Sequence, residues 1–457
     1  MKLRTNLTLS LMALLGLLGG ASPTALAAEA VAVSSLAELA RAAERSGQIV
    51  TLKPGVYRLI DLVPLNTIAE RRKRQEWPLF VFSGSNNVFH LEGATIEVDT
   101  ALRSALRPPV HTDEILITGH SNTFHGLTIT NFGKGTSPGG AALAIRGAGN
   151  TLQDFTLHVQ GSFPYGYGDL FGKGGPDIIS HQKKSGVLIT GHGTRLLGGK
   201  LYMRSFGHGY FIQKDAENVR LEDCYVEGEM RATDDMLAET NGPAFKVGFR
   251  TVVKNRAGEN LVTPGYMKSL CEDGFRTYGQ HTNLVLKNCT ARNMRGGFEL
   301  RTKTAVRLEN CTATGCERAF WISSGAVLVN GRGDAEFGPL LFVEGDRATA
   351  EIELLPTESK MNVHALAAIQ GNEHQLTIRP SPAGPRTKPV PILLGYATPM
   401  MGDGMGPMPE RSARNVSLRN ETSMPVIIGA KASGGEIVTR GPVLEHKGQK
   451  VAVRSAP

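Results

Sequence analysis

The chain has 457 residues, a formal net charge of +8 and a sequence pI near 9.2. The basic residues are spread along the chain, which suits an acidic partner but argues against a nucleic-acid-binding protein. The odd count of five cysteines argues against a disulfide scaffold, and no Cys or His spacing is typical of a metal site.

Residues 1–28 are predicted to be a secretory signal peptide. Lys2 and Arg4 give a positive start before an apolar run, and Ala25, Leu26 and Ala27 form a small-residue cleavage signature. We expect cleavage near residue 27 or 28 and a secreted or periplasmic protein. No later stretch is long and apolar enough to cross a bilayer. The remainder, 29–457, is predicted to be a single domain.

A short amphipathic helix is expected directly after this segment. Leu36, Leu39 and Ala43 share one helical face, and Ser34 or Ser35 can cap the N-terminus. The sequence "QIVTLKPGVYRL" then predicts a strand, a turn and a second strand. A short helix in this place would cover the exposed end of a sheet.

Seven similar stretches follow, each with a polar turn, a short strand, a Gly, Asp or Asn corner and a second short strand. Alternation with period two indicates β-strands, and a repeat of about 20–50 residues is typical of solenoids. Stacked coils of short parallel strands form a β-helix. The repeats begin at Asn86, His120, Ala148, His192, Ala216, His281 and Lys303.

In a β-helix, the inward-facing positions of successive coils carry similar side chains, which stack on one another. Cys224, Cys289 and Cys311 are therefore predicted to form a ladder of buried, inert thiols. The spacing of Cys224 from Cys289 is close to three of the shorter repeats, which predicts three coils between them. Residues 326–457 are expected to continue the same domain as irregular C-terminal coils.

Two long excursions interrupt the coils, at 161–186 and 229–279, and loops of this kind often carry function. Residues one repeat apart should lie above one another, which predicts a column of Lys184, His208 and Arg231 on one face. Arg204 and Tyr210 are expected nearby. A row of cations beside tyrosines suits an extended polyanion.

These residue types favour β-elimination of a uronate polymer. That reaction needs a cation to neutralise the sugar carboxylate, a base for the C5 proton and an acid for the leaving oxygen. Hydrolysis needs two carboxylates that flank the bond. Asp234 and Asp235 are the main candidates, and no second acidic cluster clearly faces them. Each candidate also has a structural alternative: His208 as a core histidine, the tyrosines as loop anchors, and the two aspartates as a helix cap.

Six sequence blocks are considered together: "FPYGYGDLFGKG", "HQKKSG", "YMRSFGHGYFIQ", "CYVEGEMRATDDMLAE", "PGYMKSLCEDGFRTY" and "NMRGGFELR". They resemble polysaccharide lyase family 31, over roughly residues 30–325. The resemblance implies a right-handed parallel β-helix, alginate lyase activity on β-1,4-linked uronates, and a catalytic tyrosine and lysine. Lys184 matches the lysine, and Tyr165 or Tyr167 matches the tyrosine, with Tyr210 as a weaker match.

The sequence thus predicts a lyase that acts on an acidic polysaccharide such as alginate, polymannuronate or glucuronan, and that works as a monomer. A β-helix C5-epimerase and a non-catalytic polysaccharide-binding protein are the alternatives. The predicted catalytic residues are Lys184, Tyr165, Tyr167, His208 and Arg204. The predicted substrate-binding residues are Arg231, Tyr210, Lys173, Arg276, Arg295 and Arg301. No cofactor is expected, and the alternative is a Ca²⁺ site made by Glu229, Asp234, Asp235 and Glu239.

Overall fold

A computed structural model describes most of the chain after the predicted signal peptide. Lys173 and residues 1–28 lie outside the described residues. No helix in the described part of the chain is long and apolar enough to cross a membrane. The described residues are 29–106, 113–136, 139–171, 179, 181–214, 216–246, 264–301, 305–357, 363, 365–384, 388–395 and 411–456.

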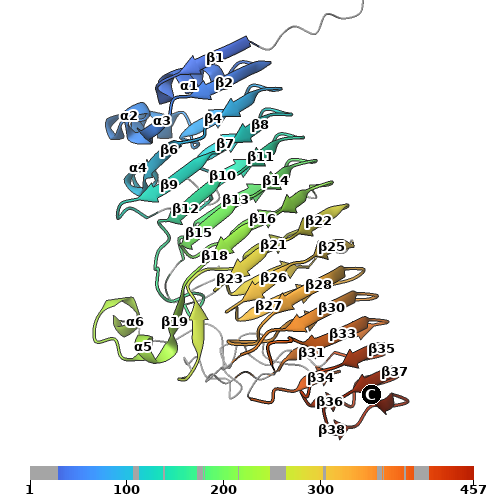
Figure 1. The fold of residues 1–457 in the computed structure, drawn as a ribbon. Helices are drawn as coiled ribbons and strands as arrows, with labels where there is room; N and C mark the ends of the chain where they lie inside the picture. Colours follow the sequence, from blue (N-terminus) through green and yellow to red (C-terminus); the bar gives the residue numbers. More distant parts are fainter. Residues whose placement is uncertain are drawn as a thin grey trace, which may run out of the picture.

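The fold is a right-handed parallel β-helix, whose coils stack from the N-terminal end to the C-terminal end (Figure 1). Each of the first complete coils contributes one strand to each of three parallel ladders. The first ladder begins with β1 (Glu29–Val33) and contains β2 (Gln48–Leu52), β5 (Val88–His90), β8 (Thr123–His125), β11 (Thr151–Gln153), β14 (Arg195–Leu197), β17 (Arg220–Glu222), β22 (Leu284–Lys287) and β25 (Val306–Glu309).

The second ladder runs beside the first. It contains β3 (Gly55–Arg58), β6 (Ala94–Asp99), β9 (Thr128–Phe132), β12 (Thr156–Gln160), β15 (Lys200–Arg204), β18 (Tyr225–Glu227), β23 (Thr290–Arg292) and β26 (Thr312–Thr314). Both ladders join at β28 (Val327–Gly333) and continue as β30 (Thr349–Leu354), β32 (Gly371–Asn372), β33 (Gln375–Pro380), β35 (Ala413–Asn420), β37 (Ala432–Thr439) and β39 (Ala452–Ser455).

The third ladder is a separate sheet that follows the second ladder in each coil. It contains β4 (Phe80–Phe82), β7 (Ile115–Ile117), β10 (Ala141–Ile145), β13 (Ser185–Ile189), β16 (Tyr210–Ile212), β21 (Phe275–Thr277), β24 (Gly296–Leu300), β27 (Arg318–Ile322), β29 (Leu341–Val343), β31 (Ala367–Ile369), β34 (Ile392–Leu394), β36 (Val426–Ile428) and β38 (Val443–His446). All seven predicted repeats are confirmed, because each contains one strand of the first ladder and one of the second.

The predicted N-terminal helix is confirmed as α1 (Leu36–Ala43). Ser35 caps it by accepting a hydrogen bond from the backbone N–H of Glu38, and Leu36, Leu39 and Ala43 are buried. The other helices interrupt the coils as short excursions. They are α2 (Leu59–Leu62), the 3₁₀ turn η1 (Leu65–Thr67), α3 (Ile68–Lys73), α4 (Thr100–Leu106), α5 (Thr233–Leu237) and α6 (Gly242–Lys246).

Aromatic rings fill the inside of the third ladder. The rings of Tyr210, Phe275, Phe298 and Phe320 stack in successive coils, with centroids 5.0, 4.7 and 5.1 Å apart. Tyr210 is only 1% exposed, and burial raises the pKa of its phenol well above the usual range. The prediction that Tyr210 binds substrate is therefore wrong, because its ring is part of the core.

The predicted cysteine ladder is confirmed. Cys224, Cys289 and Cys311 are free and buried, and burial raises the pKa of the Cys289 thiol well above its usual value. The predicted number of coils between Cys224 and Cys289 is wrong, because β17 pairs directly with β22 and β18 with β23. Residues 229–246 and 264–269, between β18 and β21, belong to an insertion within one coil.

This insertion forms a lobe beside the coils (Figure 1), which we define as residues 229–246 and 264–269. It contains α5, α6 and an antiparallel pair of strands, β19 (Met230–Ala232) and β20 (Met267–Ser269). Its residues Met236 and Ala244 share a small hydrophobic core with Tyr167 and Phe171, which lie in the excursion that begins at residue 161. The lobe explains why Arg231 is not stacked above His208. Arg231 lies in β19 opposite Lys268. The position one coil beyond His208 is occupied by Asp273, because β16 pairs with β21.

Candidate active site

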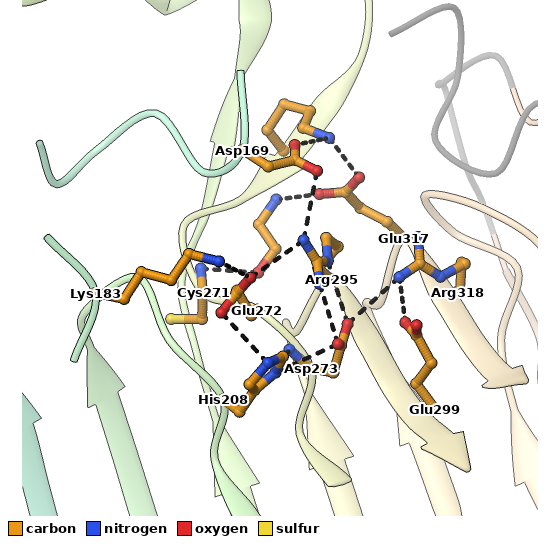
Figure 2. Close-up of polar contacts among 12 residues, drawn as sticks. Asp169, Lys183, His208, Cys271, Glu272, Asp273, Arg295, Glu299, Glu317 and Arg318 are labelled. Carbon is orange, nitrogen blue, oxygen red and sulfur yellow. Dashed lines mark hydrogen bonds and ion pairs between the residues drawn. The ribbon is translucent and has the colours of Figure 1, made fainter. Parts of the chain in front are cut away.

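The candidate site lies where the second ladder turns into the third. The same turn in neighbouring coils places Lys183 before β13, His208 before β16 and Asp273 before β21. Figure 2 shows these side chains converging with carboxylates and arginines from adjacent coils. We call this group the charge network. It contains Asp169, Lys183, His208, Lys268, Glu272, Asp273, Arg276, Arg295, Glu299, Arg301, Glu317 and Arg318.

His208 contacts three groups that matter for proton transfer. Its Nε2 lies 2.8 Å from Tyr278 Oη and 3.4 Å from Glu272 Oε2. Its Nδ1 lies 3.3 Å from Asp273 Oδ2 and 3.3 Å from the Asp273 backbone nitrogen. His208 is 6% exposed, whereas Tyr278 is 38% exposed. The phenol is therefore the part of this group that an external molecule reaches first.

Arg276 completes the surroundings of Tyr278. Its guanidinium lies 4.4 Å from the centre of the Tyr278 ring, which is a favourable cation–π contact. Partial burial raises the pKa of the Tyr278 phenol, although the charge of Arg276 acts in the opposite direction. Tyr278 is therefore protonated at neutral pH.

Two buried carboxylates in the charge network stay ionised. Burial alone would raise the pKa of Glu272, but the charges of His208, Lys183 and Arg295 lower it to about 2. Burial likewise opposes ionisation of Asp273, yet Arg295 and His208 hold its pKa well below the usual range. In Figure 2, Arg295 lies between these two carboxylates. Both are held in place by cations and can orient His208.

Lys183, rather than Lys184, is the lysine at this site. Lys183 Nζ lies 2.7 Å from Glu272 Oε1, and its side chain is 29% exposed. Lys184 is completely buried and forms an ion pair with Glu114. Burial lowers the pKa of Lys184 to about 8, against the opposing charge of Glu114. This placement argues against contact between Lys184 and a substrate.

The predicted residues Tyr165 and Arg204 meet on Glu229, at the base of the lobe. Tyr165 Oη donates a hydrogen bond of 2.5 Å to Glu229 Oε2, and Arg204 Nε lies 2.7 Å from Glu229 Oε1. Burial raises the pKa of the Tyr165 phenol. Nearly half of the Arg204 side chain is exposed. This group is separate from the His208–Tyr278 contact but could flank a bound chain.

Tyr167 and Arg231 hold the lobe together. Tyr167 Oη donates to Glu239 Oε2 at 2.8 Å, and Arg231 Nη2 donates to Glu239 Oε1 at 2.6 Å. Arg231 Nη1 also donates to the carbonyl of Gly166 at 3.1 Å. Tyr167 is 5% exposed, so the contacts of these residues are those of structural anchors.

Two of the four carboxylates considered for Ca²⁺ are already paired with arginines. Glu229 is paired with Arg204 and Glu239 with Arg231, so each already has a cation. Asp234 accepts a hydrogen bond from the Gly265 backbone N–H. Among the described residues, no group of three or more His, Cys, Asp or Glu side chains is arranged to hold a metal ion.

Tyr278, Asp273, Glu272 and Lys183 were not among the predicted site residues. Three of them stand in the sequence "CEDGFRTYG", which ends one excursion and begins β21. The available signal was a pair of acidic residues immediately before a strand and a tyrosine immediately after it. That signal is weak without knowledge that β16 and β21 are neighbours.

Comparisons with known proteins support the fold. No family model matches the chain, and no curated protein matches it. A PL6 alginate lyase in complex with a trisaccharide superposes with a TM-score of 0.50 at 10% identity, covering 93% of this chain and 89% of that chain. Alginate lyase AlyF-OU02 in complex with G6 gives 0.52 at 11% identity, covering 94% and 89%. At such identity the similarity shows the β-helix alone, and the resemblance to family 31 stays a prediction.

Proposed function

We propose that the protein is a polysaccharide lyase that cleaves a β-1,4-linked uronate polymer, such as alginate, polymannuronate or glucuronan, by β-elimination. The observation that carries the proposal is the contact of the exposed Tyr278 phenol with His208, which Asp273 orients. An exported protein would meet such polymers outside the cell. Two alginate lyases of similar fold are consistent with this activity.

In the proposed reaction, the Nδ1–H of neutral His208 donates to Asp273 Oδ2, which leaves the free electron pair on Nε2. His208 Nε2 then removes the proton from C5 of the uronate. The electron pair of that bond forms a double bond between C4 and C5, and the bond from C4 to the glycosidic O4 breaks. Tyr278, whose raised pKa keeps it protonated, donates its phenolic proton to O4. The charged imidazole then returns a proton to the phenolate across their 2.8 Å contact, which restores both groups.

The carboxylates of the charge network disfavour hydrolysis. Inverting or retaining hydrolysis needs one protonated and one ionised carboxyl group on either side of the bond. Asp169, Glu272 and Asp273 are each at most 3% exposed, as are Glu299 and Glu317, and all five are in ion pairs. Groups held by arginine and lysine in this way are poor candidates for a general acid.

The test is incubation of the protein with alginate blocks, glucuronan, pectate and glycosaminoglycans. A lyase produces a rise in ultraviolet absorbance from the unsaturated product, and Tyr278→Phe should abolish that rise. Exchange of the C5 hydrogen with solvent deuterium without unsaturated product would identify a C5-epimerase instead. Binding of a polymer with neither result would identify a non-catalytic binding protein.

A further inference from the structure

Three arginines from successive coils share the carboxylate of Glu299. Arg276 Nη1 contacts Oε1 of Glu299, Arg301 Nη2 lies 2.8 Å from the same oxygen, and Arg318 Nη2 contacts Oε2. Asp273 Oδ1 lies 3.3 Å from Arg318 Nη2, and Asp273 Oδ2 lies 3.8 Å from Arg276 Nε, beyond hydrogen-bond distance. One carboxylate that serves three guanidinium groups leaves the cluster with more donors than acceptors.

The unused donors are concentrated in this cluster. Among the described residues, Arg276 Nε, Arg301 Nε, Arg318 Nε and Nη1, and Trp321 Nε1 are buried and have no hydrogen-bond partner. A buried donor without a partner is costly, and several in one place are unusual in a folded protein. The charge count agrees, because the carboxylates of the charge network are outnumbered by its lysines and arginines.

Arg301 is the cation of this cluster that solvent reaches. Its side chain is 34% exposed, whereas Arg276 and Arg318 are 6% and 3% exposed. Its guanidinium lies 4.1 Å from the centre of the Trp321 ring, which holds the flat group in one orientation. Arg301 therefore presents a charged, oriented donor at the surface of a site with a positive excess.

The position of Arg301 relates it to the proposed reaction. Arg276 in β21 pairs with Glu299 in β24, so Tyr278 and Arg301 follow neighbouring strands at the same register. Neighbouring strands are about 4.8 Å apart, a spacing similar to the length of one pyranose residue. A polymer that runs along the axis of the coils with one sugar at Tyr278 would bring the next sugar to Arg301.

We infer that Arg301 is a specificity-determining residue that binds the carboxylate of the uronate adjacent to the reacting sugar. This inference rests on the proposed function for the identity of the polymer. The carboxylate supplies a charged acceptor to the exposed guanidinium of Arg301, whereas a neutral sugar in the same place supplies none. The site thus selects chains with consecutive uronates.

The experiment compares Arg301→Gln with a matched control, Arg307→Gln. Arg307 is exposed and pairs with Glu309 on the first ladder, outside the charge network. Both changes are made in a Tyr278→Phe background, and binding of a uronate oligosaccharide and of its carboxyl-reduced form is measured by calorimetry. Loss of a charged hydrogen bond should weaken binding of the uronate about 10- to 100-fold for Arg301→Gln, with little change for Arg307→Gln.

The carboxyl-reduced oligosaccharide should bind weakly and equally to all variants. Unchanged uronate binding by Arg301→Gln, or an equal loss for the reduced ligand, would overturn the inference. Turnover is measured separately, in chains that keep Tyr278. If no polymer yields unsaturated product but Arg301→Gln still weakens uronate binding, the lyase proposal fails and the carboxylate site stands.

Discussion

Lys183 and Lys184 are consecutive residues whose ammonium groups end in opposite environments. Lys184 is fully buried against Glu114, in a group that includes the buried side chain of Arg103. Lys183 stays partly exposed and contacts Glu272, which in turn faces His208. The first lysine therefore borders the candidate active site, and the second stabilises the coils behind it.

The two lysines should respond differently to the same substitution. Lys184→Met leaves the buried carboxylate of Glu114 without its cation, and breaking a buried ion pair costs about 3–5 kcal/mol. Lys183→Met removes a partly exposed cation from Glu272, which keeps its contacts with Arg295 and His208. It should therefore cost less stability than Lys184→Met, while turnover of the polymer should fall. Thermal unfolding and the absorbance assay measure both. Equal loss of stability in the two variants would contradict this assignment.

Tyr278 and Tyr210 provide a second matched pair. Tyr278→Phe removes the proposed proton donor and should lower the turnover rate by about 10²–10⁴-fold without a change in the unfolding midpoint. Tyr210→Phe removes only a long hydrogen bond from its phenol to the Tyr225 carbonyl at 3.3 Å, in the core. It should cost about 1 kcal/mol of stability and leave turnover unchanged. Loss of activity in Tyr210→Phe with an intact fold would show that the core assignment is incomplete.

Much of the fold could be predicted from the sequence because coil positions repeat. The two strands of each repeat place residues such as Leu221 and Cys224 at inward positions, where only packing matters. The site was harder to predict because its residues lie in turns of unequal length. The spacing of about one repeat between His208 and Arg231 predicts that they stack, but Arg231 lies in β19 of an insertion within the coil. No local pattern distinguishes Lys183 from Lys184, since the side to which each points is set by the turn.

The lobe should open locally when its anchor is removed. Arg231 donates to Glu239 and to the Gly166 carbonyl and lies 5.5 Å from the centre of the Tyr167 ring. Arg231→Ala should therefore speed cleavage by trypsin or chymotrypsin within residues 229–246, while the unfolding midpoint of the coils changes little. The control is Arg220→Ala, which removes an arginine paired with Glu222 on the first ladder. Equal cleavage of the two variants would mean that Arg231 does not anchor the lobe.

Glu272 should make stability depend on acidity. Its pKa is about 2 in the folded chain, compared with an ordinary value of 4.5. A depressed pKa contributes stability that is fully present above the ordinary value and is lost as the pH falls through the folded value. The contribution is on the order of 3 kcal/mol, and it should decline between pH 4.5 and pH 2.

Glu272→Gln isolates this contribution, because glutamine does not titrate. Wild type should unfold at a higher temperature than Glu272→Gln at neutral pH, and the gap should shrink as the pH is lowered from 4.5 toward 2. Glu70→Gln is the matched control, since Glu70 is exposed and paired with Lys73. A gap between wild type and Glu272→Gln that stays constant over this range would mean that Lys183, His208 and Arg295 do not hold Glu272 ionised.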